Sequence, residues 1–134
     1  MIHGLVKNGG SARHVQQHID LIDPQSSRSL RLKRPRAPAR AAIDEIFTED
    51  CVFYEPKGVY RGRGEIDRIA GVIKASHSDF RYQPIVEPEE LGNAGRIRWV
   101  SGRPGESPAY AGTDFIIVRD GRIAAIYLFF DKLP

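Results

Sequence analysis

The sequence predicts an α+β domain in which about three N-terminal helices pack on one face of a curved antiparallel sheet. Apolar residues recur at helical spacing up to about residue 77, and at alternate positions in the β-rich segments after it. The dipeptide Asp120-Gly121 lies between two runs rich in β-formers, which is typical of a two-residue hairpin. Helices followed by long strands indicate an α+β arrangement, and 134 residues suit one domain.

The first part of the chain predicts helices at about 12–22, from Pro38 onwards and at about 64–77. The first begins after Ser11 and stops at Asp23-Pro24, because the residue before a proline avoids the helical region. Proline suits the first turn of the second helix. The apolar faces of the second and third helices carry Ala39, Ala42, Ile43, Ile46 and Phe47, and Ile66, Ile69, Ala70, Ile73 and His77.

The later part of the chain predicts strands that alternate apolar and polar residues. We expect strands at 51–55, 80–86 and 96–99 and on both sides of Asp120-Gly121, with a turn at 92–95 and a loop at 102–109.

The hairpin also predicts a register. A two-residue loop pairs Arg119 with Arg122, which places Asp114 opposite Tyr127 farther along. Side chains alternate between faces, so one face would carry Tyr110, Asp114, Ile116, Val118, Ile123, Ala125, Tyr127, Phe129 and Asp131. The other would carry Thr113, Phe115, Ile117, Ala124, Ile126, Leu128 and Phe130. Both faces are largely apolar, so we expect helices over one and a second subunit over the other.

The charge is concentrated in one segment. Residues 25–40 hold six Lys and Arg and no acid, whereas the rest of the chain has 14 basic and 17 acidic residues. The prolines and the lack of an apolar period predict a solvated loop. The alternative is a phosphate-binding arm, but the segment has no aromatic residue for base stacking, so nucleic acid is not the expected partner.

Composition excludes several classes. The single cysteine, Cys51, cannot form an internal disulfide or a multi-cysteine zinc site. No apolar run approaches the roughly 18 residues of a membrane span, and residues 1–10 predict a flexible terminus without a signal peptide, so we expect a cytoplasmic protein. His14 and His18 have metal-ligand spacing, but no third ligand is evident, so no metal is predicted.

Asp114 is the leading candidate for chemistry. An ionised carboxylate in an apolar setting is costly unless it is paired, and such groups serve as general acids or bases. The structural alternative is a buried carboxylate that only orders its surroundings. Asp131, at the end of the last strand, is a second candidate, and His77 would form a dyad if it lay beside Asp114.

Two stretches resemble a known family. YAGTDFIIVRDGRIAAIYLFFD and FTEDCVFYEPKGVYRGRGEI are similar to SnoaL-like proteins of the nuclear transport factor two-like superfamily. The resemblance covers about residues 39–131 and implies a cone-shaped (cystatin-like) roll, with an apolar pocket at its open end and a dimer in the usual case. We expect this single domain to span 11–134. The long basic insertion at 24–38 departs from the family's short connection. Relatives include polyketide cyclases, ketosteroid isomerases, epoxide hydrolases and many proteins without enzymatic activity.

The expected function is binding of a small, mostly apolar organic molecule. If the chain is an enzyme, we expect cofactor-independent isomerase or cyclase chemistry, or hydrolase-like acid–base chemistry, with Asp114 moving a proton and Tyr127 polarising a carbonyl. One alternative function is that of a non-catalytic ligand-binding or dimerisation domain. A second alternative is nucleic-acid binding through residues 25–40. The expected substrate-binding residues are Tyr54, Tyr82, Trp99, Tyr110 and Phe129.

Overall fold

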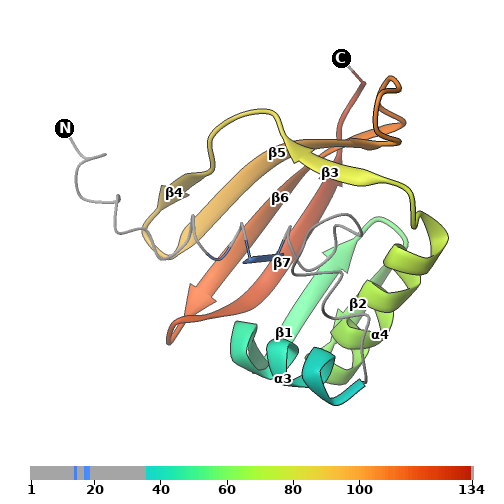
Figure 1. The fold of residues 1–134 in the computed structure, drawn as a ribbon. Helices are drawn as coiled ribbons and strands as arrows, with labels where there is room; N and C mark the ends of the chain where they lie inside the picture. Colours follow the sequence, from blue (N-terminus) through green and yellow to red (C-terminus); the bar gives the residue numbers. More distant parts are fainter. Residues whose placement is uncertain (1–13, 15–16, 19–35, 134) are drawn as a thin grey trace.

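The computed structural model describes residues 14, 17, 18 and 36–133, and for 36–40 it describes the backbone alone. It confirms the predicted α+β class: a curved sheet that does not close, with α3 and α4 gathered beside β1 and β2 (Figure 1). The basic segment before residue 36 lies outside the described residues, as does most of the helix expected at 12–22. His14, Gln17 and His18 are described, and all three are helical.

The two described helices bury the predicted apolar faces. α3 covers Arg36–Ile46 and α4 covers Gly62–Ser76, where Ile66 and Ala70 are buried. The assignment of Phe47 to a helix was wrong, because Phe47 begins β1 and lies opposite Ile123 in the sheet. The helices that the structure describes include none long and apolar enough to cross a membrane.

The sheet has the order β2-β1-β7-β6-β5-β3, and β4 also pairs with β5. Its strands are β1 (Phe47–Glu55), β2 (Gly58–Arg61), β3 (Arg81–Pro84), β4 (Glu89–Leu91), β5 (Ala94–Gly102), β6 (Tyr110–Arg119) and β7 (Arg122–Phe130). The sequence did not predict β2. The expectation of an antiparallel sheet holds for every pair except β1 and β7, which run parallel.

The hairpin at Asp120-Gly121 forms as predicted, but the register beyond it differs. Both turn residues have positive φ, as a tight two-residue turn requires. Arg119 pairs with Arg122, whereas Ile117 pairs with Ala125, so the register shifts by one residue. This bulge reverses the side-chain alternation along the rest of β7. The prediction that Asp114 faces Tyr127 was therefore wrong: Asp114 pairs with Leu128.

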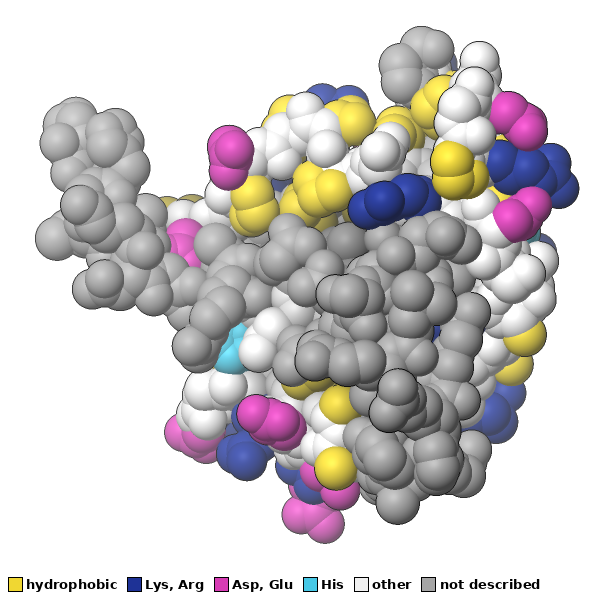
Figure 2. Space-filling view, in the orientation of Figure 1, with side chains coloured by type: hydrophobic (Ala, Val, Ile, Leu, Met, Phe, Trp, Pro, Cys, Tyr) yellow, Lys and Arg dark blue, Asp and Glu magenta, His cyan; other side chains and the backbone are white. Residues whose placement is uncertain are grey.

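The sheet consequently has an inner face, which packs on the helices, and an outer face. The inner face contributes Phe53, Ile97, Trp99, Ile116 and Ile126 to one core cluster with Ile43 and Ile66 of the helices. The strand alternation puts Tyr54, Thr113, Phe115, Tyr127, Phe129 and Asp131 on the outer face. The space-filling view shows hydrophobic side chains at the surface among charged ones near the end where β3 and β5 lie (Figure 2).

Candidate functional site

A cavity of about 510 Å³ lies between α4 and the inner face of the sheet. This size is in the range of small-molecule sites, which are commonly 300–1,000 Å³. The α4 wall consists of Ile69, Val72, Ile73, Ser76 and His77. The sheet wall consists of Phe53, Tyr82, Trp99, Tyr110, Leu128 and Phe130. Glu55, Lys57 and Tyr60, around the β1–β2 turn, complete the lining.

Local sequence periodicity explains how each wall forms. Ile69, Val72, Ile73 and Ser76 follow the i, i+3, i+4, i+7 spacing that places side chains on one face of a helix. On the sheet side, paired strands present the lining residues in register, since Trp99 pairs with Gly112 and Gly112 pairs with Phe130. The lining is predominantly aromatic and apolar, so it favours a ligand with a large apolar surface.

Trp99 is held in place by its neighbours on β6. A Cβ built on Gly112 would lie 2.4 Å from Cζ2 of the Trp99 ring, so only glycine leaves room for the indole there. The indole Nε1–H donates to Oδ1 of Asp114 at 3.1 Å. On its other sides the ring makes edge contacts with Tyr82 and Phe130, with centroid distances of 5.1 and 6.4 Å. The indole N–H is therefore engaged within the protein.

Asp114 lies beneath this wall. Its side chain is 0% exposed, and it is not among the residues that line the cavity. Its Oδ2 lies 2.9 Å from Nε2 of His18, a residue 96 positions earlier in the chain. An ionised carboxylate only accepts hydrogen bonds, so His18 donates from Nε2 in that state. Both carboxylate oxygens thus have a buried partner.

The end of the cavity at the β1–β2 turn is polar. The Tyr60 hydroxyl donates to Oε1 of Glu55 at 3.1 Å. Burial and, secondarily, this hydrogen bond to a carboxylate raise the pKa of Tyr60 above its ordinary value. Lys57 adds a cationic group to the lining here. This end can accommodate a polar group of a ligand whose remainder is apolar.

The opposite end contains His77, which caps α4. Its ring lies 4.7 Å from that of Phe80 and 5.6 Å from that of Tyr110, measured between centroids. The Arg103 guanidinium lies over Phe80 and pairs with Asp79 at 2.5 Å, which ties the β5–β6 loop to the turn after α4. This end therefore combines an imidazole and a phenol hydroxyl in one apolar wall.

The structure separates the predicted site residues into two groups. His77, Tyr82, Trp99 and Tyr110 all line the cavity, and Asp114 lies behind it. The remaining predicted residues lie on the outer face. The bulge in β7 puts Tyr127, Phe129 and Asp131 there, and Tyr54 of β1 lies beside Tyr127.

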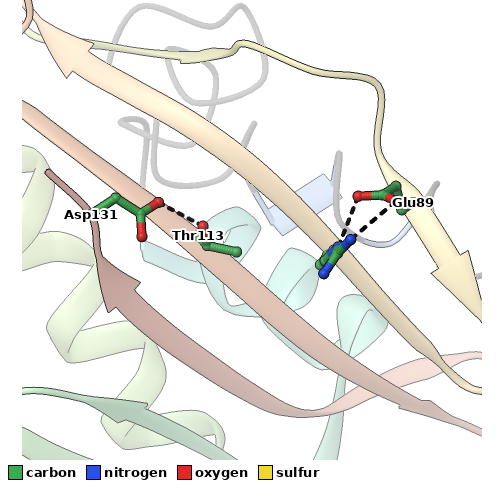
Figure 3. Close-up of polar contacts among 4 residues, drawn as sticks. Glu89, Thr113 and Asp131 are labelled. Atoms are coloured by element: carbon green, nitrogen blue, oxygen red, sulfur yellow. Dashed lines mark hydrogen bonds and ion pairs between the residues drawn. The ribbon is translucent and has the colours of Figure 1, made fainter. Parts of the chain in front are cut away.

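On that outer face the tyrosine rings of Tyr54 and Tyr127 stack at 4.6 Å. Asp131 accepts a hydrogen bond from Thr113 at 2.7 Å, and Glu89 pairs with Arg96, on the side of the sheet away from the helices (Figure 3). The pairing of Asp114 with Tyr127 in one site was therefore wrong, and so was a dyad of Asp114 with His77, because His18 takes that place.

Sequence reasoning missed His18, Tyr60 and Phe130 as site residues. Tyr60 belongs to the unpredicted strand β2, and Phe130 was assigned to the outer face by the straight register. The three-residue spacing of Ile123 and Ile126, both buried, is the signal that could have revealed the bulge. No local pattern indicates His18, whose partner is distant in the sequence. Among the described residues, no group of three His, Cys, Asp or Glu side chains is placed to hold a metal ion.

Comparisons with known proteins agree with this architecture. No curated protein matches the sequence. A candidate isomerase of the SnoaL-like family from Agrobacterium tumefaciens superposes with a TM-score of 0.76 at 17% identity, covering 92% of this chain and 98% of that one. A candidate polyketide cyclase from Sinorhizobium meliloti gives 0.64 at 22% identity, covering 87% and 94%. A candidate ketosteroid isomerase from Kribbella flavida gives 0.66 at 13% identity, covering 93% and 80%.

These structures share the fold and are too distant in sequence to assign an activity. The family model is more specific, because the SnoaL-like domain matches residues 36–126, which include α3, α4, most of the cavity walls and the hairpin turn. The chain therefore belongs to the SnoaL-like family.

Proposed function

We propose that this chain binds a small, mostly apolar organic molecule in the cavity between α4 and the inner face of the sheet. The observation that carries the proposal is the cavity itself: about 510 Å³, bounded by apolar and aromatic side chains, with polar groups at its two ends. Family membership supports the same role. Flat aromatic walls favour a ligand that presents ring faces or edges to them.

Trp99 makes this binding measurable, because it is the single tryptophan and it lines the cavity. Titration with 9-fluorenone, a tricyclic aromatic ketone, should quench its fluorescence saturably. Val72→Phe should weaken the binding about tenfold by filling the cavity, since Val72 is part of the lining. Ala75→Phe is the matched control, because Ala75 is exposed on the same helix and does not line the cavity. Equal effects of the two variants would contradict binding at this site.

We further propose that the chemistry, for a ligand with an acidic C–H beside a carbonyl, is cofactor-independent proton transfer of the isomerase or cyclase type. His77 takes the proton, and the Tyr110 hydroxyl donates a hydrogen bond to the enolate oxygen. Return of the proton to another carbon would complete an isomerisation. The support is that both side chains line the same end of the cavity, whereas Asp114 does not line it.

Exchange of the α-hydrogens of 2-tetralone into D₂O, followed by NMR, tests the proton transfer without knowledge of the natural substrate. The protein should accelerate the exchange, and His77→Gln should lower that acceleration at least about a hundredfold, the size of a general acid–base contribution. Binding of 9-fluorenone should remain within about threefold. Unchanged exchange in His77→Gln would exclude His77 as the base.

We also propose that a second copy of the chain covers the outer face. Among the described residues, this face carries an aromatic strip of Tyr54, Phe115, Tyr127 and Phe129, of which Phe129 is 54% exposed. A groove along it includes Arg96 and Arg98 as well as Glu87, Glu89 and Asp131. A two-fold interface brings a surface against its own copy, so charges of both signs on this face can pair with those of the second copy.

A further inference from the structure

Two side chains from different parts of the chain meet at the Asp114 carboxylate, beneath the cavity. Trp99 from β5 donates to one carboxylate oxygen, and His18 from the N-terminal part of the chain contacts the other. Asp114 is 0% exposed and His18 is 4% exposed. A buried carboxylate is costly unless hydrogen-bonded, so both contacts are needed to keep it in place.

A direct catalytic role for Asp114 does not fit this geometry. A general acid or base must reach the proton that it moves, at about 2.6–3.2 Å or through one water. Asp114 is absent from the cavity lining, and the indole that it binds forms part of that lining. The carboxylate can instead control the cavity by fixing the orientation of Trp99.

The space around Trp99 makes this orientation depend on Asp114. Because a Cβ at Gly112 would overlap the ring, the indole must lie close against the β6 backbone there, and Asp114 is two residues farther along the same face. Glycine permits the close approach but provides no side chain to direct the ring. The hydrogen bond from Nε1 to Asp114 supplies that direction.

His18 in turn depends on Asp114. Its Nδ1 is buried and has no hydrogen-bond partner among the described residues, so in that part of the chain its one polar contact is through Nε2. Its ring also lies against the edge of Phe53, another cavity-lining residue, at 6.5 Å between centroids. His18 thus contacts both a wall residue and the group that positions Trp99.

We infer that Asp114 and His18 are positioning residues for the ligand cavity: His18 holds the Asp114 carboxylate, which fixes the Trp99 indole as a rigid wall. His18 is then a component of the binding site, although it does not itself line the cavity. This inference rests on the proposed function for its effect on ligand affinity. Its structural half, the fixation of Trp99, can be measured without any ligand.

The ligand-free measurement is hydrogen exchange at the Trp99 indole. A ¹⁵N-labelled sample gives a single indole N–H signal, because the chain has one tryptophan. The hydrogen bond to Asp114 should make this exchange slow. The second measurement is the affinity for 9-fluorenone, followed by Trp99 fluorescence.

The variants distinguish a role of His18 in positioning Trp99 from a role in merely holding its segment against the sheet. His18→Leu removes the donor to Asp114 and should speed indole exchange and weaken 9-fluorenone binding about tenfold each. His18→Gln retains a donor, so both quantities should stay within about threefold. His14→Leu is the matched control: His14 is 3% exposed in the same part of the chain, and its Nε2 donates to the carbonyl oxygen of Gly121 at 2.6 Å. It should leave both quantities within about twofold.

Asp114→Asn adds an independent test. Asparagine can still accept from Trp99 but presents an amide N–H₂ to His18, so indole exchange should change less than in His18→Leu.

Equal effects of His14→Leu and His18→Leu would overturn the inference, since both residues would then only hold their segment against the sheet. If 9-fluorenone fails to bind the unmodified protein, the proposed function fails, and the exchange rates alone decide whether His18 positions Trp99.

Discussion

The inner and outer faces of the sheet are built from the same strands but differ in what covers them. On β6, Asp114 and Ile116 of the inner face are fully buried, whereas Thr113, Phe115 and Ile117 of the outer face are only partly so. On the inner face the Asp114 carboxylate is held by internal hydrogen bonds, while carboxylates of the outer face lie among arginines near the surface. Strand β6 therefore contributes one side to a core that contains a cavity, and its other side to an aromatic surface.

Two neighbouring isoleucines, one on each face of β6, should show the largest effect of this difference in burial. Ile116→Ala should lower the free energy of unfolding by about 2–5 kcal/mol, because Ile116 is 0% exposed and its loss leaves a cavity in the core. Ile117→Ala, on the outer face, should cost clearly less at low protein concentration. Urea unfolding curves give both values. Equal losses would show that the two faces are equivalent in the monomer.

Gly112 tests how closely the inner face is packed. Gly112→Ala should destabilise the protein by about 1–3 kcal/mol, since the new Cβ would meet the Trp99 ring at 2.4 Å and Phe129 O at 2.9 Å. Gly71→Ala is the control: no atom lies within 4 Å of its Cβ position in α4, and alanine favours a helix by about 1 kcal/mol. Thermal unfolding should move in opposite directions for the two variants.

Phe129 and Phe130 separate the functions proposed for the two faces. They are adjacent and similarly exposed, at 54% and 53%, but Phe129 lies on the outer face, whereas Phe130 packs near Trp99 and Tyr110. Phe129→Ser should weaken self-association about tenfold or more, roughly 1.4 kcal/mol, and spare 9-fluorenone binding. Phe130→Ser should weaken 9-fluorenone binding more than self-association, because Phe130 lines the cavity and also borders the outer groove. If sedimentation equilibrium shows that the unmodified protein is a monomer at micromolar concentration, the proposed dimer is ruled out.

The smallest expected effect concerns the ion pair at the His77 end of the cavity. The Arg103 hydrogen bond lowers the pKa of Asp79 below its ordinary value. A carboxyl group with a lowered folded-state pKa adds stability above its unfolded pKa of about 4, and that stability is lost as the pH falls through the folded value. Asp79→Asn should therefore cause a small loss of stability at pH 7 that disappears below about pH 3. Glu45→Gln, at an exposed position of α3, is the control for removing a negative charge.

Features governed by neighbouring residues could be predicted from the sequence. The α4 face follows from helical spacing, the turn at Asp120-Gly121 from residues that tolerate positive φ, and the cavity positions of Tyr82, Trp99 and Tyr110 from strand alternation and family resemblance. The bulge after Ile123 could not be predicted by continuing the turn's register, because one extra residue leaves the turn unchanged while exchanging the faces beyond it.

The contacts made at long range were also beyond local reasoning. The His18–Asp114 contact joins two residues that no periodic pattern relates, and the role of His18 becomes visible only once the sheet is assembled. The parallel pairing of β1 with β7 is of the same kind, because hairpin signals report only on strands joined by short turns.

That parallel pairing has a consequence for how the protein reaches its native state. β1 precedes every other strand in the described part of the chain, yet its neighbour in the middle of the sheet, β7, follows all of them. During synthesis, β1, β2 and α4 can form local structure but lack their main partner until β7 has left the ribosome. Contacts between segments so distant in sequence slow folding, because the loop between them must close first. We therefore expect that nascent chains ending before β7 expose β1 and the apolar face of α4 and depend on chaperones.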